Sequence, residues 1–133
     1  MAPMKMKTAP KKKRILVVDD EEQICRVIQK ILSQEGYDVL TALGGEEALK
    51  HLKETFVDLI LVDLKMPTMD GLELLRQGSR IQKKLKSILL TAYGTVSSAR
   101  EAMMLGVYDF LTKPFDNQLL KKVVKEALGD KLK

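Results

Sequence analysis

The chain has 133 residues, of which 45% are hydrophobic and 31% charged, the balance of a single globular domain with one core. No apolar run approaches the length of a membrane span, and no apolar signal segment begins the chain. A single cysteine, Cys25, excludes an internal disulfide. We therefore expect a cytoplasmic protein without a membrane segment.

The net charge of +5 comes from the amino-terminal segment. Residues 1–14 contain Lys and Arg but no acid, and the rest of the chain is close to neutral. This composition predicts a disordered basic tail over 1–13, a folded domain over 14–129 and a short tail over 130–133. The basic run could be a nucleic-acid arm or a nuclear-type signal, although a solvated extension is the favoured interpretation.

The first half of the domain alternates short apolar runs with helical periodicity. Residues 15–18 form a continuous run typical of a strand buried on both faces. A helix ending at Gly36 follows, with an apolar face of Ile24, Val27, Ile28, Ile31 and Leu32. Residues 37–41 predict a second strand, and a short helix follows Gly44 and Gly45.

The second half repeats the same cycle. Strands are predicted over 57–62, 87–91 and 107–111, and helices around 72–77, over 95–105 and from Asp116 onward. Asp70 and Glu73 have the spacing of a capping box, and Gly78-Ser79 is expected to interrupt its helix. The inward side chains of the last two helices are predicted to be Val96, Ala99, Met103, Leu119, Leu120, Val123, Val124, Ala127 and Leu128. Five strands alternating with five helices predict an α/β fold, with an open parallel sheet covered on both faces.

Polar side chains stand where four of these strands end. Asp19 and Asp20 follow the first strand, Asp63 ends the third, Thr91 ends the fourth, and Lys113 follows the fifth. Ligands of such sheets bind at the carboxyl ends of the strands, so we expect these side chains to converge on one edge. Each residue alone has an ordinary explanation as a helix cap or a solvated side chain, but together they indicate a site.

Three neighbouring carboxylates repel one another, by about 4 kcal/mol for each pair at 4 Å in an effective dielectric of 20. A hard divalent cation relieves this repulsion, and Mg²⁺ prefers oxygen ligands and completes its shell with phosphate oxygens. A carboxylate beside such a metal can accept a phosphoryl group. The Lys113 ammonium and the Thr91 hydroxyl can each contact a phosphoryl oxygen.

Four segments carry a resemblance to a known family, and they come in the same order as in that family. They are residues 15–21, 61–71, 90–94 and 109–115. The chain from Arg14 to about Leu128 is similar to the receiver domain of bacterial two-component response regulators, most of all to receivers of ATPase transcription activators. The resemblance implies a flavodoxin-like, doubly wound sheet of strand order 2-1-3-4-5.

The resemblance also implies a role for each site residue. Asp63 would be the phosphoacceptor. Mg²⁺ would be held by Asp20, Asp63 and the backbone carbonyl of Lys65, and by Asp19 through water. The remaining roles would be a switch pair, Thr91 with Phe110, and a cis peptide bond at Lys113-Pro114. Phosphorylation would change the surface of the fourth helix, fifth strand and fifth helix.

Two positions bear on how long a phosphoryl group would survive. Lys65 and Tyr93 lie two residues after Asp63 and Thr91, where the family flanks the hydrolytic water. Neither side chain is a carboxylate or amide suited to orienting water. We therefore predict a long-lived phosphoryl state.

The stretch from Arg76 to Lys86 is basic and lacks acids, and its bases are Arg76, Arg80, Lys83, Lys84 and Lys86. It should lie near the amino ends of the strands. It could bind an acidic partner, although a solvated loop is the more common meaning of such a run.

Two other functions compete with that of a receiver. A phosphatase of the haloacid dehalogenase type needs a second acid two residues after its nucleophile, and that position is Lys65 here. A constitutive docking module without phosphorylation is a further alternative. The chain should not be a turnover enzyme, and no DNA-binding domain is expected within the few residues after Leu128. It is either a stand-alone receiver or a piece of a longer protein. The expected partners are a histidine kinase or histidine phosphotransfer protein, an output protein or domain, and a second copy after phosphorylation.

Overall fold

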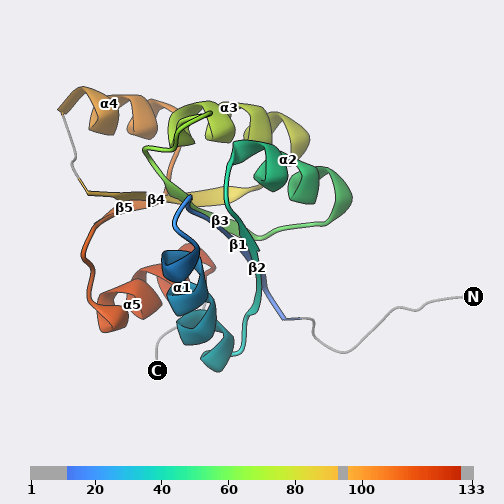
Figure 1. Ribbon diagram of the computed structural model, residues 1–133, viewed down its shortest axis with the longest axis vertical. Coiled ribbons are helices and arrows are strands. Elements are labelled where there is room, and N and C mark those ends of the chain that lie inside the picture. The colour runs from blue at the N-terminus through green and yellow to red at the C-terminus, as the bar shows by residue number, and fades with distance from the viewer. Residues whose placement is uncertain (1–11, 93–95, 130–133) are drawn as a thin grey trace, which may run out of the picture.

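The computed structural model describes residues 12–92 and 96–129 (Figure 1). Five strands alternate with five helices in the described chain. The strands are Arg14–Val18 (β1), Asp38–Ala42 (β2), Leu59–Asp63 (β3), Lys86–Thr91 (β4) and Asp109–Thr112 (β5). The helices are Glu22–Gln34 (α1), Gly45–Glu54 (α2), Gly71–Ile81 (α3), Val96–Met104 (α4) and Asn117–Ala127 (α5).

The strands form one parallel sheet in the order β2-β1-β3-β4-β5. The predicted fold class and strand order are therefore confirmed. Predicted strand boundaries are wrong by no more than about two residues, the usual uncertainty at element ends. The order reverses beside β1, so the carboxyl ends of β1 and β3 flank the position where such sheets bind ligands.

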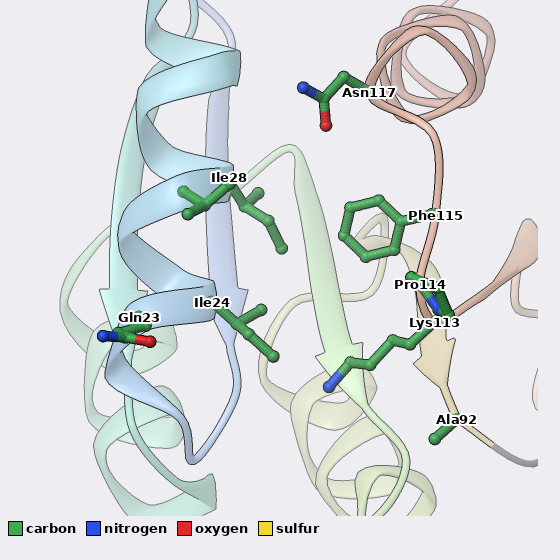
Figure 2. A pocket seen from close by; sticks show the side chains of 9 residues that line it. Gln23, Ile24, Ile28, Ala92, Lys113, Pro114, Phe115 and Asn117 are labelled. Carbon is green, nitrogen blue, oxygen red and sulfur yellow. The ribbon is translucent and has the colours of Figure 1, made fainter.

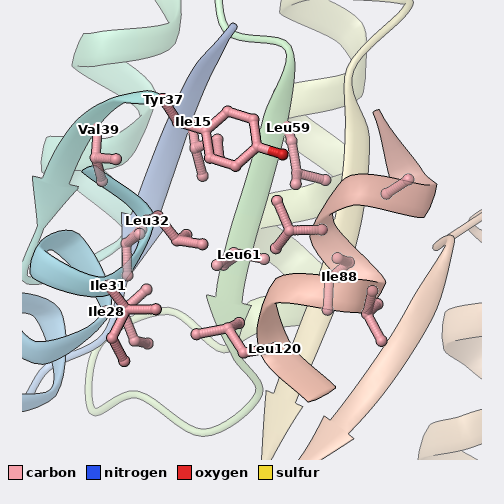
Figure 3. Close-up of a cluster of buried hydrophobic side chains, with 14 of the residues drawn as sticks. Ile15, Ile28, Ile31, Leu32, Tyr37, Val39, Leu59, Leu61, Ile88 and Leu120 are labelled. Atoms are coloured by element: carbon pink, nitrogen blue, oxygen red, sulfur yellow. The ribbon is translucent and has the colours of Figure 1, made fainter. Parts of the chain in front are cut away.

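Side chains of the central strands alternate between two cores. Ile15, Val17 and Leu61 pack with α1 and α5 (Figure 3). Leu16 and Ile60 point to the opposite face, which is covered by α2, α3 and α4 (Figure 1). Because both faces are buried, the strands need continuous apolar runs, and this is why the sequence pattern revealed them.

The helix ends follow their sequence signals. Asp70 accepts a hydrogen bond from the Glu73 backbone N–H at 2.8 Å, and Asp116 accepts one from the Gln118 N–H at 3.0 Å. Gly36 has a φ of +96°, a left-handed conformation that suits glycine just after α1. None of the helices in the described part of the chain is long and apolar enough to cross a membrane.

The prediction that Gly78-Ser79 interrupts the third helix is wrong. Helix α3 continues to Ile81, and Gly78 is buried within it. A Cβ at Gly78 would lie 3.0 Å from the Leu52 Cδ1. The glycine therefore lets α2 and α3 pack closely, a tertiary requirement that outweighs its poor helix propensity.

Three residues predicted to face the core are exposed instead. They are Val27 at 54%, Met103 at 63% and Leu119 at 45% exposure. Their places are taken by neighbours on the helix, Cys25 in α1 and Ala102 in α4. The apolar stripe predicted from spacing was wider than the face that the sheet covers. The side chains of Val96 and Ala99 lie outside the described residues.

Candidate functional site

Five of the predicted site residues lie at one edge of the sheet. Asp19 and Asp20 directly follow β1, and Asp63 is the last residue of β3. Thr91 ends β4, and its register partner on β5 is Thr112, one residue before Lys113. Parallel pairing thus brings four separate strand ends together, as the sequence pattern predicts.

The three carboxylates form a compact cluster. One oxygen from each of Asp19, Asp20 and Asp63 lies within 4.8 Å of the others. Asp19 is fully buried, Asp63 is 8% exposed and Asp20 is exposed. Asp19 accepts a hydrogen bond from the Glu21 backbone N–H at 2.9 Å, which fixes its carboxylate. This set of oxygen donors fits a hard divalent cation such as Mg²⁺.

Lys113 supplies the positive charge of the site. Its Nζ donates to Asp19 Oδ2 at 2.6 Å and lies 3.5 Å from Asp63 Oδ2. Figure 2 shows its side chain extending from the segment after β5 toward the end of the central strands. The Lys113–Pro114 peptide bond is cis. Burial alone would lower the pKa of Lys113, but the hydrogen bond and charge of Asp19, with Asp63, raise it above its ordinary value.

Asp63 is held in an unfavourable environment for its charge. Burial and the neighbouring Asp19 raise its pKa, and Lys113 and the Lys65 backbone N–H only partly offset them. That N–H lies 3.3 Å from Asp63 Oδ1, and the Lys65 side chain is exposed. A cation bound beside Asp63 would therefore stabilise its charged form.

The unfavourable electrostatic environment of Asp63 predicts that removing its charge stabilises the domain. Asp63→Asn should raise the free energy of unfolding of the metal-free domain at pH 7, because burial and the charge of Asp19 disfavour the carboxylate and not the neutral amide. Because the pKa of Asp63 in the folded domain lies above its ordinary value of 3.8, the folded state binds this proton more tightly than the unfolded state does. The stabilisation from this protonation is complete below pH 3.8 and is lost as the pH rises through the folded pKa. Urea denaturation in EDTA from pH 3.5 to 7 measures both effects.

The matched control for this prediction is Asp116→Asn, because asparagine caps a helix as well as aspartate does. It should change stability little at any pH. Added Mg²⁺ should stabilise the wild type more than Asp63→Asn. An advantage of Asp63→Asn that does not grow with pH would contradict the electrostatic explanation.

The structure describes both residues of the predicted switch pair. Thr91 is 5% exposed at the end of β4. Phe110 is partly buried against the core beneath α2, α3 and α4. Tyr93 lies outside the described residues. The use of the Lys65 carbonyl as a metal ligand stays a prediction.

Two features of the site were not anticipated from the sequence. A Cβ at Gly71 would lie 2.6 Å from the Asp63 carbonyl oxygen, so α3 begins in direct contact with the end of β3. An apolar hollow of about 560 Å³ also lies beside Lys113, between α1 and the segment after β5 (Figure 2). Its walls include Ile24, Val27 and Phe115. The unexpected exposure of Val27 is explained by its place on this wall.

Solved structures of similar fold come from several microbes. The chain superposes on a CheY-like receiver domain protein from Methanospirillum hungatei with a TM-score of 0.87 and 33% identity, covering 90% of this chain and 95% of that one. It matches the chemotaxis protein CheY4 of Vibrio cholerae with a TM-score of 0.84 and 28% identity, covering 88% and 99% of the two chains.

The family model of the response regulator receiver domain matches residues 15–125. The chain belongs to the response regulator receiver domain family. It is 39% identical over 114 residues to the transcriptional regulatory protein GlrR of Escherichia coli, and 36% identical over 115 residues to the regulatory protein AtoC of the same organism. These alignments cover 86% of this chain and about a quarter of each relative, 26% and 25%. The resemblance stated from the motifs is thereby confirmed.

Proposed function

We propose that this chain is a phosphoacceptor domain of two-component signal transduction, in which Asp63 accepts a phosphoryl group from a phosphohistidine. The donor is a histidine kinase or a histidine phosphotransfer protein, and the reaction takes place in the cytoplasm. The observation that carries the proposal is the position of Asp63. Its carboxylate is buried 3.5 Å from the Lys113 ammonium and beside Asp19 and Asp20. Membership of the receiver family supports it.

The transfer uses the side chains at this edge of the sheet together with a bound Mg²⁺. An Asp63 carboxylate oxygen attacks the phosphorus, a new P–O bond forms, and the P–N bond to the donor imidazole breaks. The leaving imidazole takes up a proton, and Asp63 becomes an acyl phosphate. Lys113 exchanges part of its contact with Asp19 for a phosphoryl oxygen, and the Thr91 hydroxyl donates to another.

The acidic cluster is the place for the metal. Asp20, Asp63 and the Lys65 carbonyl would hold Mg²⁺, with Asp19 through water. Bound Mg²⁺ supplies neutralising charge for the carboxylates and the phosphoryl oxygens.

Phosphorylation is read out through Thr91 and Phe110. Thr91 moves toward the phosphoryl oxygens, and Phe110 turns into the space that it leaves. The altered surface is that of α4, β5 and α5, where Met103, Met104 and Tyr108 are exposed at 63%, 82% and 48%. Exposed apolar side chains of this kind suit an output domain, an output protein or a second phosphorylated copy.

The side chain of Lys65 bears on two further points. It is exposed beside Asp63, where a dehalogenase-type phosphatase would need an acid, so this feature favours an acceptor over a turnover enzyme. It also cannot orient water as an acid or amide would, and we therefore expect a phosphoryl half-life of minutes or longer. A half-life of seconds would contradict this expectation.

Intact mass spectrometry tests the proposal. The protein is incubated with a small phosphodonor and Mg²⁺, and an adduct of about 80 Da is expected, the mass of one phosphoryl group. The adduct should require Mg²⁺ and be absent from Asp63→Asn. Asp70→Asn, which keeps a capping side chain at the start of α3, is the control and should be modified like the wild type. No adduct at saturating donor would leave the constitutive docking module as the better description.

A further inference from the structure

The amino ends of the strands carry a second charged surface, opposite the acidic site. It consists of Lys12, Lys13, Phe56, Lys83 and Lys84, which we call the amino-edge surface. All five side chains are exposed. The four lysine ammonium groups make no hydrogen bond or ion pair with any described residue, in contrast to Lys113 at the other edge.

Backbone and side-chain contacts make this surface continuous. The Gln82 amide nitrogen donates to the Leu52 and Thr55 carbonyls at 2.8 and 2.7 Å, and its oxygen accepts from the Val57 N–H at 3.0 Å. These bonds fix the loop of Lys83 and Lys84 against the segment that contains Phe56. On the other side, the Arg14 Nη1 donates to the Phe56 carbonyl at 3.3 Å, which places Lys12 and Lys13 next to the ring.

A hollow of about 680 Å³ lies within this surface. It is lined by Lys12, Lys13, Arg14, Asp38, Phe56 and Asp58. The Phe56 ring is 62% exposed on its wall. Both acids are already engaged by Arg14, since Asp38 Oδ2 accepts from its Nε and Asp58 Oδ2 from its backbone N–H, each at 2.7 Å. Arg14 neutralises Asp38, Asp58 keeps its charge, and the four lysines leave the amino-edge surface with a net positive charge.

We infer that the amino-edge surface binds an acidic peptide segment of a partner protein that also carries apolar side chains. An apolar side chain can enter the hollow against Phe56, while carboxylates on either side reach the rim lysines. A nucleic acid fits less well, because it carries a negative phosphate at every nucleotide. Some of these phosphates would lie against the carboxylates of Asp38 and Asp58 and be repelled by them.

Binding here is independent of the phosphorylation site. The two edges are separated by the length of a five-residue strand, about 17 Å. This distance is roughly twice the Debye length of about 8 Å at physiological ionic strength. Asp63→Asn should therefore leave peptide affinity unchanged, so the outcome is separate from that of the phosphoacceptor proposal.

Fluorescence anisotropy with a labelled short peptide that alternates Asp or Glu with Leu or Phe tests this inference on the whole chain. The double variant Lys83→Glu, Lys84→Glu should weaken binding at least about tenfold, and Phe56→Ser severalfold. The matched control is Lys50→Glu, Lys122→Glu, which reverses the same number of exposed lysines on α2 and α5 and should stay within about twofold. Circular dichroism checks that each variant is folded.

Three results would overturn the inference. They are the absence of peptide binding to the wild type, an equal loss in the Lys50 and Lys122 control, and tighter binding of a single-stranded oligothymidine than of the peptide. The last result would make the surface a nucleic-acid site instead.

Discussion

Replacing Lys113 with methionine is expected to lower the free energy of unfolding of the metal-free domain by about 3 kcal/mol. The Asp19 carboxylate is fully buried, and its Oδ2 accepts from the Lys113 Nζ at 2.6 Å. Methionine fills much of the same space but removes the charge, so Asp19 becomes a buried carboxylate without a cation. Removing one member of a buried pair costs far more than the pair contributes, because the other charge stays desolvated.

Urea denaturation in EDTA measures this effect, and two further variants interpret it. Adding Asp19→Asn to Lys113→Met should restore most of the stability, because the buried charge is gone and an Asn oxygen can still accept from the Glu21 N–H. Lys121→Met is the matched control, since its pair with Glu35 is longer, at 3.7 Å, and more exposed. It should cost less than about 1 kcal/mol. A double variant as unstable as Lys113→Met would refute the explanation.

Gly71→Ala is expected to damage both stability and phosphoryl acceptance. The new Cβ would lie 2.6 Å from the Asp63 carbonyl oxygen and 3.0 Å from the Leu64 Cα. Both neighbours are backbone atoms, so relief requires the chain around Asp63 to move. Overpacking of this kind costs about 1–3 kcal/mol, and a displaced Asp63 carboxylate should accept a phosphoryl group at least about tenfold more slowly.

Gly44→Ala is the control for this substitution. Nothing lies within 4 Å of a Cβ built at Gly44, and its φ of −171° is extended backbone that alanine adopts readily. Because Gly44 is the N-cap of α2, where alanine is poorer than glycine, its unfolding free energy should fall by no more than about 1 kcal/mol, with the same rate of phosphorylation. Thermal denaturation and the initial rate of adduct formation measure the two quantities. Equal behaviour of the two variants would show that the contact between Gly71 and Asp63 is unimportant.

The features that the sequence predicted well are those that depend on local pattern. Runs such as residues 15–18 must be apolar on both faces, so they mark a buried strand wherever they occur. The polar residue after each run then lies at a strand end, and parallel pairing brings the strand ends to one edge. These two features predict that Asp19, Asp63 and Lys113 lie together, although the sequence contains no distances.

The features that the sequence did not predict depend on contacts between distant residues. Gly78 was interpreted as a helix breaker because its role, close packing against Leu52, involves another helix. Gly71 belongs to the motif of residues 61–71, but its contact with the Asp63 backbone was not predicted, for the same reason. Lys113 was expected to contact a phosphoryl oxygen, and the sequence did not indicate that in the unphosphorylated structure its closest contact is Asp19.

Whether Asp63 is the phosphoacceptor is tested most directly by locating the phosphoryl group within the chain. After incubation with phosphodonor and Mg²⁺, borohydride reduces an aspartyl phosphate to the side chain of homoserine, and peptide mass mapping identifies the altered residue. Homoserine is expected at position 63 alone, and none when Mg²⁺ is withheld. Homoserine at Asp19, Asp20 or another acid, with Asp63 intact, would contradict the assignment of Asp63 as the acceptor.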